Sequence, residues 1–221
     1  TARVAAAHAG VTHRPGRGGR GPGAAVRGRS GIRKGRRDAC RKGYDPAVSL
    51  TFTLDPAVTP ALRDGVLDLW TDVSNAGGAV GFVAPVSRDE IRPDLVRHLA
   101  AIAEGRNRLL VGQDASGQVA ATAFFAFNSH RLQTHWVMLY TVMVHPRHQG
   151  KGYGRDLLAA AADAARGFDG VEAIRLGCRG GLGLERFYGS CGYKEVGRVP
   201  GAIRVAPGDD RDDITMLLPL T

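Results

Sequence analysis

One stretch of the chain constrains the fold more than any other, because an apolar run is followed by a glycine-rich turn and then by a helical pattern. The run Trp136–Val144 is almost continuously apolar, as in a strand that is buried on both faces. Pro146 ends that strand, and alternate glycines occupy the segment Gly150–Gly154. Apolar residues then recur at helical spacing as far as Arg166, so the stretch predicts strand, turn and helix in an α/β sheet.

The remaining elements follow from periodicity and from capping residues. Thr59 and Pro60 are typical of the first turn of a helix, and Ser87 with Glu90 forms a capping box for the next one. The expected helices span 60–75, 88–104, 152–166 and 184–191, and the expected strands span 48–54, 108–112, 118–127, 136–144, 174–178, 193–198 and 213–220. The order of these elements mixes hairpins with crossovers.

Charge separates the chain into two parts. Residues 1–43 hold twelve of the 30 Lys and Arg residues and one acidic residue, whereas residues 44–221 hold 18 basic and 20 acidic residues. The first part also contains ten glycines and no Phe, Trp or Tyr, so it has little to bury against the entropy cost of ordering. We therefore expect a disordered basic tail over 1–43 and one folded domain over 44–221.

Three explanations of the basic tail are open: an arm that touches RNA or DNA, a targeting peptide, or an appended segment without a role of its own. No aromatic residues are interleaved with the arginines, which argues against stacking on bases. Nucleic acid is therefore not the expected partner. No apolar run reaches the ~18 residues that a membrane span needs, so no membrane is expected either.

The cysteines bear on metal binding, on disulfide formation and on the cellular compartment. Cys40, Cys178 and Cys191 lack the spacing of a zinc site or of a disulfide framework, so we expect free thiols and no metal. No secretory signal pattern is found in the sequence. Free thiols and the missing signal pattern together favour a reducing, cytoplasmic location.

The glycine-rich turn has the features of an anion-binding site. Glycines let the backbone turn tightly and approach a ligand, and the following helix begins with N–H groups that favour a phosphate. Lys151 and Arg155 add positive charge. The pattern GxxxxGK[ST] of phosphate-binding loops is absent, and the spacing of a dinucleotide fingerprint does not fit. The turn therefore predicts a phosphate ligand of another kind.

The turn instead reads Gln-x-x-Gly-x-Gly, with Gln149, Gly152 and Gly154 at the defined positions. Downstream, Tyr188 is followed four and five residues later by a glycine and an aromatic residue. In both blocks the chain resembles the GNAT superfamily of acyl-CoA-dependent acyltransferases, over about residues 48–221. The resemblance implies an α/β fold with a mixed, mostly antiparallel central sheet, splayed middle strands and flanking helices.

The resemblance also implies the cofactor, acetyl-CoA, and the residues that contact it. Family members bind the coenzyme A diphosphate on the amides of this turn, which here are Gln149, Gly150, Lys151, Gly152, Tyr153, Gly154 and Arg155. Members also pair the pantetheine arm with free main-chain groups of the preceding strand, here Val142, Met143 and Val144. A main-chain N–H placed there would stabilise charge on the thioester oxygen as an amine attacks.

In many family members the tyrosine of the second block protonates the departing thiolate, and the resemblance implies this role for Tyr188. The alternative is a half-buried aromatic residue on a core stripe, because Leu184 and Cys191 share its helix face. Two family features are absent: Gly181 replaces an asparagine that often contacts pantetheine, and no carboxylate lies on the strand before the turn. The general base is therefore unassigned.

Two further groups of polar residues are expected to contact solvent. His145 and His148 lie in the turn region, where we expect solvated side chains. The four aspartates within Asp209–Asp213 are expected in a loop before the last strand. There they either attract a cationic amine or form a solvated turn.

These observations predict an N-acetyltransferase. An acetyl group would move from acetyl-CoA to a primary amine by direct attack, with Tyr188 as the general acid. The expected acceptor is a small-molecule amine or a peptide of unknown identity, and a homodimer is allowed. The alternative is a non-catalytic acyl-CoA-binding or regulatory module, with or without a basic arm that touches nucleic acid.

Overall fold

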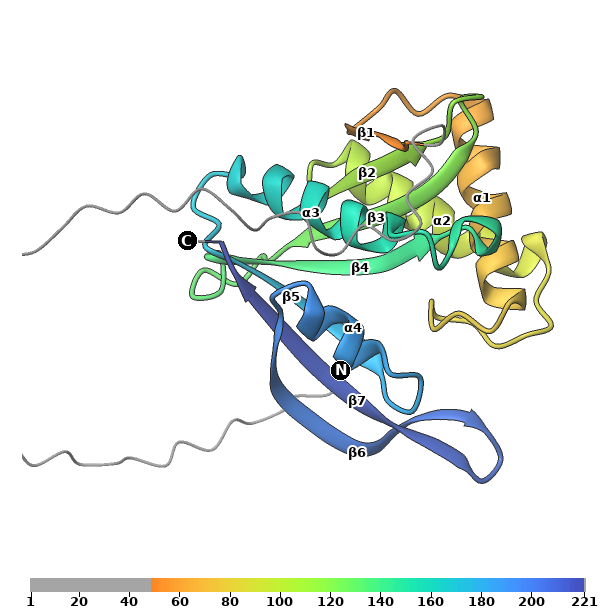
Figure 1. The fold of residues 1–221 in the computed structure, drawn as a ribbon. Helices are drawn as coiled ribbons and strands as arrows, with labels where there is room; N and C mark the ends of the chain where they lie inside the picture. Colours follow the sequence, from red (N-terminus) through yellow and green to blue (C-terminus); the bar gives the residue numbers. More distant parts are fainter. Residues whose placement is uncertain (1–48, 221) are drawn as a thin grey trace, which may run out of the picture. The chain divides into compact units, whose positions relative to one another are not determined.

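A computed structural model describes residues 49–220, which form a sheet with helices packed against it (Figure 1). The expected basic tail over 1–43 lies outside the described residues. The helices are α1 (Pro60–Asn75), α2 (Arg88–Ala103), α3 (Tyr153–Arg166) and α4 (Leu184–Ser190), with a short 3₁₀ turn at Pro146–His148. The strands are β1 (Thr51–Leu54), β2 (Asn107–Gln113), β3 (Val119–Phe127), β4 (Trp136–Val144), β5 (Ala173–Arg179), β6 (Lys194–Ala206) and β7 (Asp209–Pro219).

The strands form one sheet in the order β1-β2-β3-β4-β5-β7-β6. Within the described sheet, β4 and β5 are the one parallel pair, and the other neighbouring pairs are antiparallel. The parallel pair is joined through α3, since parallel strands need a crossover connection. The expectation of a mixed, mostly antiparallel sheet flanked by helices is confirmed.

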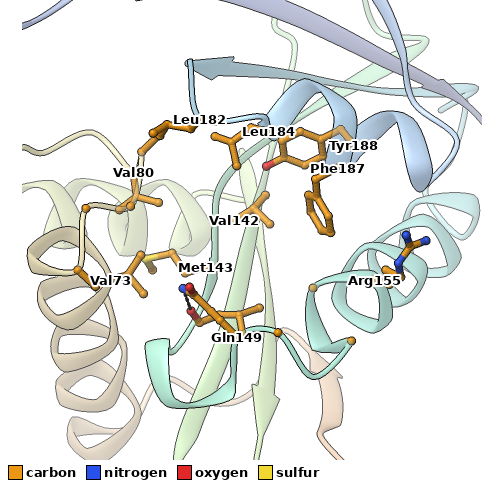
Figure 2. Close-up of a pocket in the computed structure, with 18 residues that line it drawn as sticks. Val73, Val80, Val142, Met143, Gln149, Arg155, Leu182, Leu184, Phe187 and Tyr188 are labelled. Atoms are coloured by element: carbon orange, nitrogen blue, oxygen red, sulfur yellow. Dashed lines mark hydrogen bonds between the residues drawn. The ribbon is translucent and has the colours of Figure 1, made fainter. Parts of the chain in front are cut away.

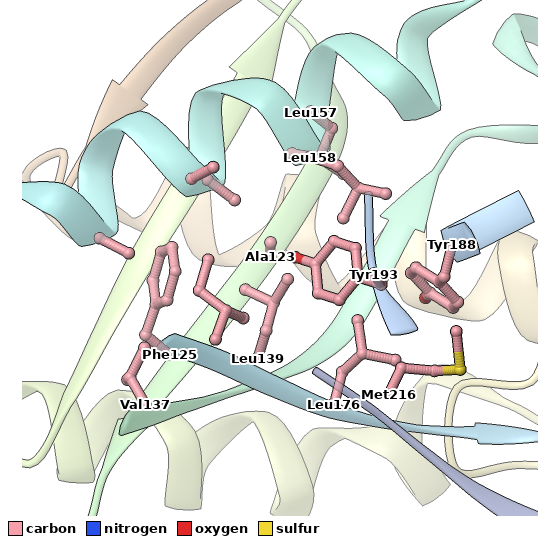
Figure 3. Packing of buried hydrophobic residues seen from close by; sticks show 14 of the residues in the cluster. Ala123, Phe125, Val137, Leu139, Leu157, Leu158, Leu176, Tyr188, Tyr193 and Met216 are labelled. Carbon is pink, nitrogen blue, oxygen red and sulfur yellow. The ribbon is translucent and has the colours of Figure 1, made fainter. Parts of the chain in front are cut away.

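Two apolar clusters cover the two faces of the sheet. The helices α1 and α2 pack on one face, where Trp70 and Ile91 meet Phe124 of β3. On the other face α3 packs over Phe125 and Leu139, and α4 packs over β5 and β7 (Figure 3). Phe124 and Phe125 are neighbours in the sequence and both are fully buried, because side chains alternate between the faces of a strand.

Local capping sets the first residues of α1 and α2. The Thr59 side chain accepts a hydrogen bond from the backbone N–H of Leu62 at 3.1 Å, and Pro60 occupies the first turn. Ser87 and Glu90 form the full capping box at the start of α2. These helix starts were predictable because the responsible contacts span only three residues.

The last hairpin is longer than the pattern predicted, and the expected loop at Asp209–Asp213 is wrong. These aspartates lie on β7, and Asp210 is the cross-strand partner of Arg204 on β6. The Arg204 guanidinium donates two hydrogen bonds to that carboxylate, at 2.7 and 2.8 Å. Most residues of β6 are exposed, so the strand lacks the apolar alternation by which a half-buried strand is recognised.

Candidate active site

The strands β4 and β5 separate near the middle of the sheet. Their pairing covers Trp136–Met138 and Ala173–Arg175, and beyond it Leu139–Val144 pairs only with β3 in the described sheet. One extra residue on β4 shifts the register with β3, and Thr141 there has a φ of 47°. Such a bulge bends a strand and increases its twist. The main-chain groups on the β5 side of this segment are therefore free of strand pairing.

The glycine turn presents unpaired backbone donors beside that gap. Gly150 and Gly152 have φ angles of 75° and 94°, a region that glycine enters without steric cost. Gly152 is also the N-cap of α3, and it contributes no capping side chain. Among residues 49–220, nothing accepts a hydrogen bond from the backbone N–H of Gly150, Lys151 or Gly152. Unpaired N–H groups at a helix N-terminus favour an anion.

The gap and the turn border a pocket of about 530 Å³, which α1 and α4 close from the sides (Figure 2). Nine of the residues predicted for cofactor binding or catalysis line it: Val142, Met143, Val144, Gln149, Gly150, Gly152, Gly154, Arg155 and Tyr188. Lys151 is exposed and is not part of the lining. Tyr153 also lies outside it, because its side chain is buried with its ring 5.8 Å from that of His148.

Two of the predicted cofactor residues hold the shape of the pocket through their side chains. The Gln149 side chain donates a hydrogen bond to the Val144 carbonyl at 2.9 Å and so closes the base of the turn (Figure 2). The Arg155 guanidinium donates to the Ser190 carbonyl at 3.1 Å, which ties the start of α3 to the end of α4. The backbone N–H groups of these two residues are also paired within the protein, since that of Gln149 donates to the Pro146 carbonyl at 3.2 Å and that of Arg155 to the Gly152 carbonyl at 2.9 Å.

Gly154 allows α3 and α4 to approach each other. A Cβ atom at this position would lie 3.0 Å from the tip of the Phe187 ring, closer than most such contacts. Phe187 lines the pocket one residue before Tyr188. The second glycine of the motif is therefore explained by the close packing of α3 against α4.

Tyr188 carries its hydroxyl at the edge of this pocket. The residue is 8% exposed and belongs to the cluster under α3 and α4, while its oxygen points toward Leu184 and Val142 (Figure 2). Burial raises the pKa of the Tyr188 hydroxyl, so the group keeps its proton at neutral pH. No group within residues 49–220 hydrogen-bonds to the hydroxyl. A protonated donor without a protein partner thus faces the pocket.

Comparison with known proteins decides the family. A model of the GNAT acetyltransferase family matches residues 79–193, more than half of the chain. The chain belongs to the GNAT acetyltransferase family. The matched region contains the gap, the turn and Tyr188. No curated protein matches this chain.

Solved structures share the GNAT fold at low sequence identity. A candidate phosphinothricin N-acetyltransferase is 20% identical, with a TM-score of 0.64 over 78% of this chain and 99% of the other. A candidate acetyltransferase from Salmonella typhimurium, solved with its cofactor acetyl-CoA, is 24% identical, with a TM-score of 0.62 over 78% and 95%. Spermidine N-acetyltransferase from Vibrio cholerae, in complex with CoA and spermine, is 20% identical, with a TM-score of 0.59 over 76% and 95%.

One wall of the pocket in this GNAT domain was missed by sequence reasoning. The segment Val73–Val80, at the end of α1, faces the turn across the pocket. The sequence shows Gly77 and Gly78 there, which indicate only that a helix ends. Packing also favours glycine at position 78, because a Cβ atom there would lie 2.8 Å from the Val73 carbonyl oxygen. The glycine pair is the sequence signal that could have drawn attention to this segment.

The expectation of solvated side chains is wrong for His148 in the turn region. His148 is 8% exposed, and burial is the largest cause that lowers its pKa. His145 is partly buried, and its ring lies 3.1 Å from an oxygen of Asp72 on α1. Both histidines pack the turn against the rest of the GNAT domain.

The side chain of Arg211 fills the space beside Gly181, the position where family members often have asparagine. Gly181 has a φ of 85°. The Arg211 guanidinium lies where a side chain at position 181 would begin. A larger residue at position 181 would displace that guanidinium. The observed position of the Arg211 side chain therefore depends on the glycine.

Within residues 49–220, no group of three His, Cys, Asp or Glu side chains is arranged to hold a metal ion. The helices of that same region are too short or too polar to cross a bilayer.

Proposed function

We propose that this GNAT protein transfers the acetyl group of acetyl-CoA to the nitrogen of an amine. The observation that carries the proposal is the convergence of three features on one pocket of about 530 Å³. These features are the unpaired N–H groups of the turn, the open edge of β4 and the Tyr188 hydroxyl.

The residues of the pocket fit acetyl-CoA, which would supply the thioester. The N–H groups of Gly150, Lys151 and Gly152 would bind the diphosphate, because they have no acceptor within residues 49–220. The free edge of β4 at Val142–Val144 would pair with the amides of pantetheine. The same edge would orient the thioester carbonyl and stabilise charge on its oxygen.

Tyr188 would act as the general acid in this reaction. Its buried hydroxyl holds a proton and points into the pocket (Figure 2). As the amine nitrogen bonds to the acetyl carbon and the carbon–sulfur bond breaks, Tyr188 would donate that proton to the sulfur, the nitrogen would lose a proton to solvent, and the tyrosine would be reprotonated from solvent.

An amine acceptor agrees with the chemistry named for the neighbours. Spermidine and phosphinothricin appear in the names of proteins that share this fold. We therefore place the acceptor among small amines or peptides with a free amino group.

Calorimetry with acetyl-CoA and thiol release with a panel of amines test the proposal. Acetyl-CoA should bind, whereas NAD, which also carries a diphosphate, should not, because the fingerprint for NAD is absent. Addition of an accepted amine should release free CoA thiol in proportion to acetylated product. No binding at millimolar acetyl-CoA to folded protein would contradict the proposal. Binding without thiol release for every amine would instead favour a non-catalytic acyl-CoA-binding module.

A further inference from the structure

A second pocket, of about 310 Å³, adjoins the proposed cofactor pocket. It lies between the loop that follows α1, the end of β5 and the β6–β7 hairpin. Ala79 lines both pockets, so they meet at this loop. A ligand in the second pocket would therefore lie next to the first.

The polar residues of this second pocket face away from Tyr188. Cys178 on β5 and Ile214 on β7 belong to the apolar cluster that contains Tyr188. Since side chains alternate along a strand, the adjacent residues Arg179 and Asp213 lie on the opposite face of the sheet. An acceptor held by these two residues would thus approach the gap between β4 and β5 from the face opposite the general acid.

Arg179 and Asp213 are direct cross-strand partners, yet they form no ion pair. They occupy paired positions on β5 and β7, where opposite charges usually interact. The Arg179 guanidinium instead donates a long hydrogen bond of 3.5 Å to the Gly77 carbonyl. Within residues 49–220, no cationic nitrogen lies within 4.0 Å of the Asp213 carboxylate. Arg179 and Asp213 are thus cross-strand neighbours without an ion pair, although Asp209 is close enough to Arg179 to interact with it electrostatically.

The neighbouring aspartates show that this lack of pairing is specific to position 213. Each of the three other aspartates of this segment binds an arginine of the same hairpin. The pairs are Asp209 with Arg211, Asp210 with Arg204, and Asp212 with Arg198. Of the four aspartates of this segment, Asp213 is therefore the one without an arginine partner.

We propose that the acceptor is an α-amino acid with an apolar side chain, an inference that rests on the proposed function. Arg179 receives the carboxylate of the acceptor, because a guanidinium binds a planar carboxylate through two parallel hydrogen bonds. Asp213 attracts the amino group next to it. Phe82 and Val205, which also line the pocket, contact the side chain. These two charges match a zwitterion better than they match a simple amine.

The test compares α-amino acids with the monoamines that lack only the carboxylate. Phenylalanine is paired with phenethylamine and leucine with isoamylamine, and kcat/KM is measured by thiol release with the full chain. The native protein should prefer each amino acid over its monoamine by about 10-fold or more. Arg179→Gln should lower kcat/KM for the amino acids by about 10- to 100-fold and leave that for the monoamines within ~2-fold.

Two further variants distinguish a loss of acceptor binding from a general disturbance of the fold. Arg198→Gln removes an ion-paired arginine of the same hairpin outside the pocket and should not change the preference for amino acids. Arg179→Lys keeps the charge and should restore part of the lost preference. Monoamines that react as well as amino acids, or an Arg179→Gln effect that is equal for both series, would overturn the inference. No acetylation in either series by protein that acetylates another amine of the panel would overturn the inference alone, whereas no thiol release with any amine of the panel would overturn the proposed function.

Discussion

Tyr188 and Tyr193 lie close together in the structure, but their positions allow them different roles. Burial raises the pKa of both Tyr188 and Tyr193, and their rings lie 5.7 Å apart in the same cluster. The Tyr193 hydroxyl is fully buried and has no hydrogen-bond partner within residues 49–220 (Figure 3 shows its ring beside Leu158). Tyr188 differs because it lines the cofactor pocket. Only Tyr188 can therefore pass a proton to a bound group.

Tyr188→Phe should lower turnover by about 10²- to 10⁴-fold, the usual contribution of a general acid. The affinity for acetyl-CoA should stay the same, because the ring and its packing remain. Turnover is measured by thiol release and affinity by calorimetry. Tyr193→Phe is the matched control: it removes a buried unsatisfied hydroxyl and should leave both quantities unchanged. Equal turnover in native protein and Tyr188→Phe would remove the assigned role.

Among the elements, the turn and α3 together make the anion-binding part of the site. Their features could be predicted because glycine conformations and helix N-termini are local properties. The roles of the Gln149 and Arg155 side chains could not, since both bind carbonyls of other elements. The sequence pattern therefore located the turn correctly but did not indicate how it is held in place.

Gly152→Ala should weaken acetyl-CoA binding by about 10-fold or more, because alanine disfavours a φ of 94° and the turn must rearrange. Gly208→Ala is the matched control, since Gly208 has a φ of 79° in the β6–β7 turn and also has free space around it. Each substitution should lower the free energy of unfolding by about 1–2 kcal/mol in urea titrations. Normal acetyl-CoA binding by Gly152→Ala would argue against the turn as the diphosphate site.

For the whole molecule, two histidines packed inside it make stability depend on pH. His98 on α2 stacks on Trp70 at 5.5 Å, and burial lowers its pKa. Burial likewise lowers the pKa of His148. In the unfolded chain both would titrate near the ordinary value of 6.5. The unfolded state then binds more protons than the folded state once the pH falls below that value, so acid favours unfolding.

The urea midpoint should therefore fall as the pH is lowered from 7.5 to 5.5, before the carboxylates titrate. His98→Phe keeps an aromatic ring against Trp70 and should reduce this pH dependence. His135→Gln, at an exposed position between β3 and β4, should leave it unchanged. A midpoint that does not change over this range, or the same dependence in His98→Phe, would contradict the assignment.

Sequence alone determined the order of helices and strands, the first residues of α1 and α2, the glycine turn and the family. These features depend on periodicity, capping and backbone conformation within a few residues, so they can be read locally. Tertiary structure decided that Val73–Val80 faces the turn, that β4 separates from β5, and that Arg179 and Asp213 stay unpaired. These features depend on contacts between residues far apart in the chain. The length of an exposed strand such as β6 depends likewise on cross-strand ion pairs, which leave no apolar pattern in the sequence.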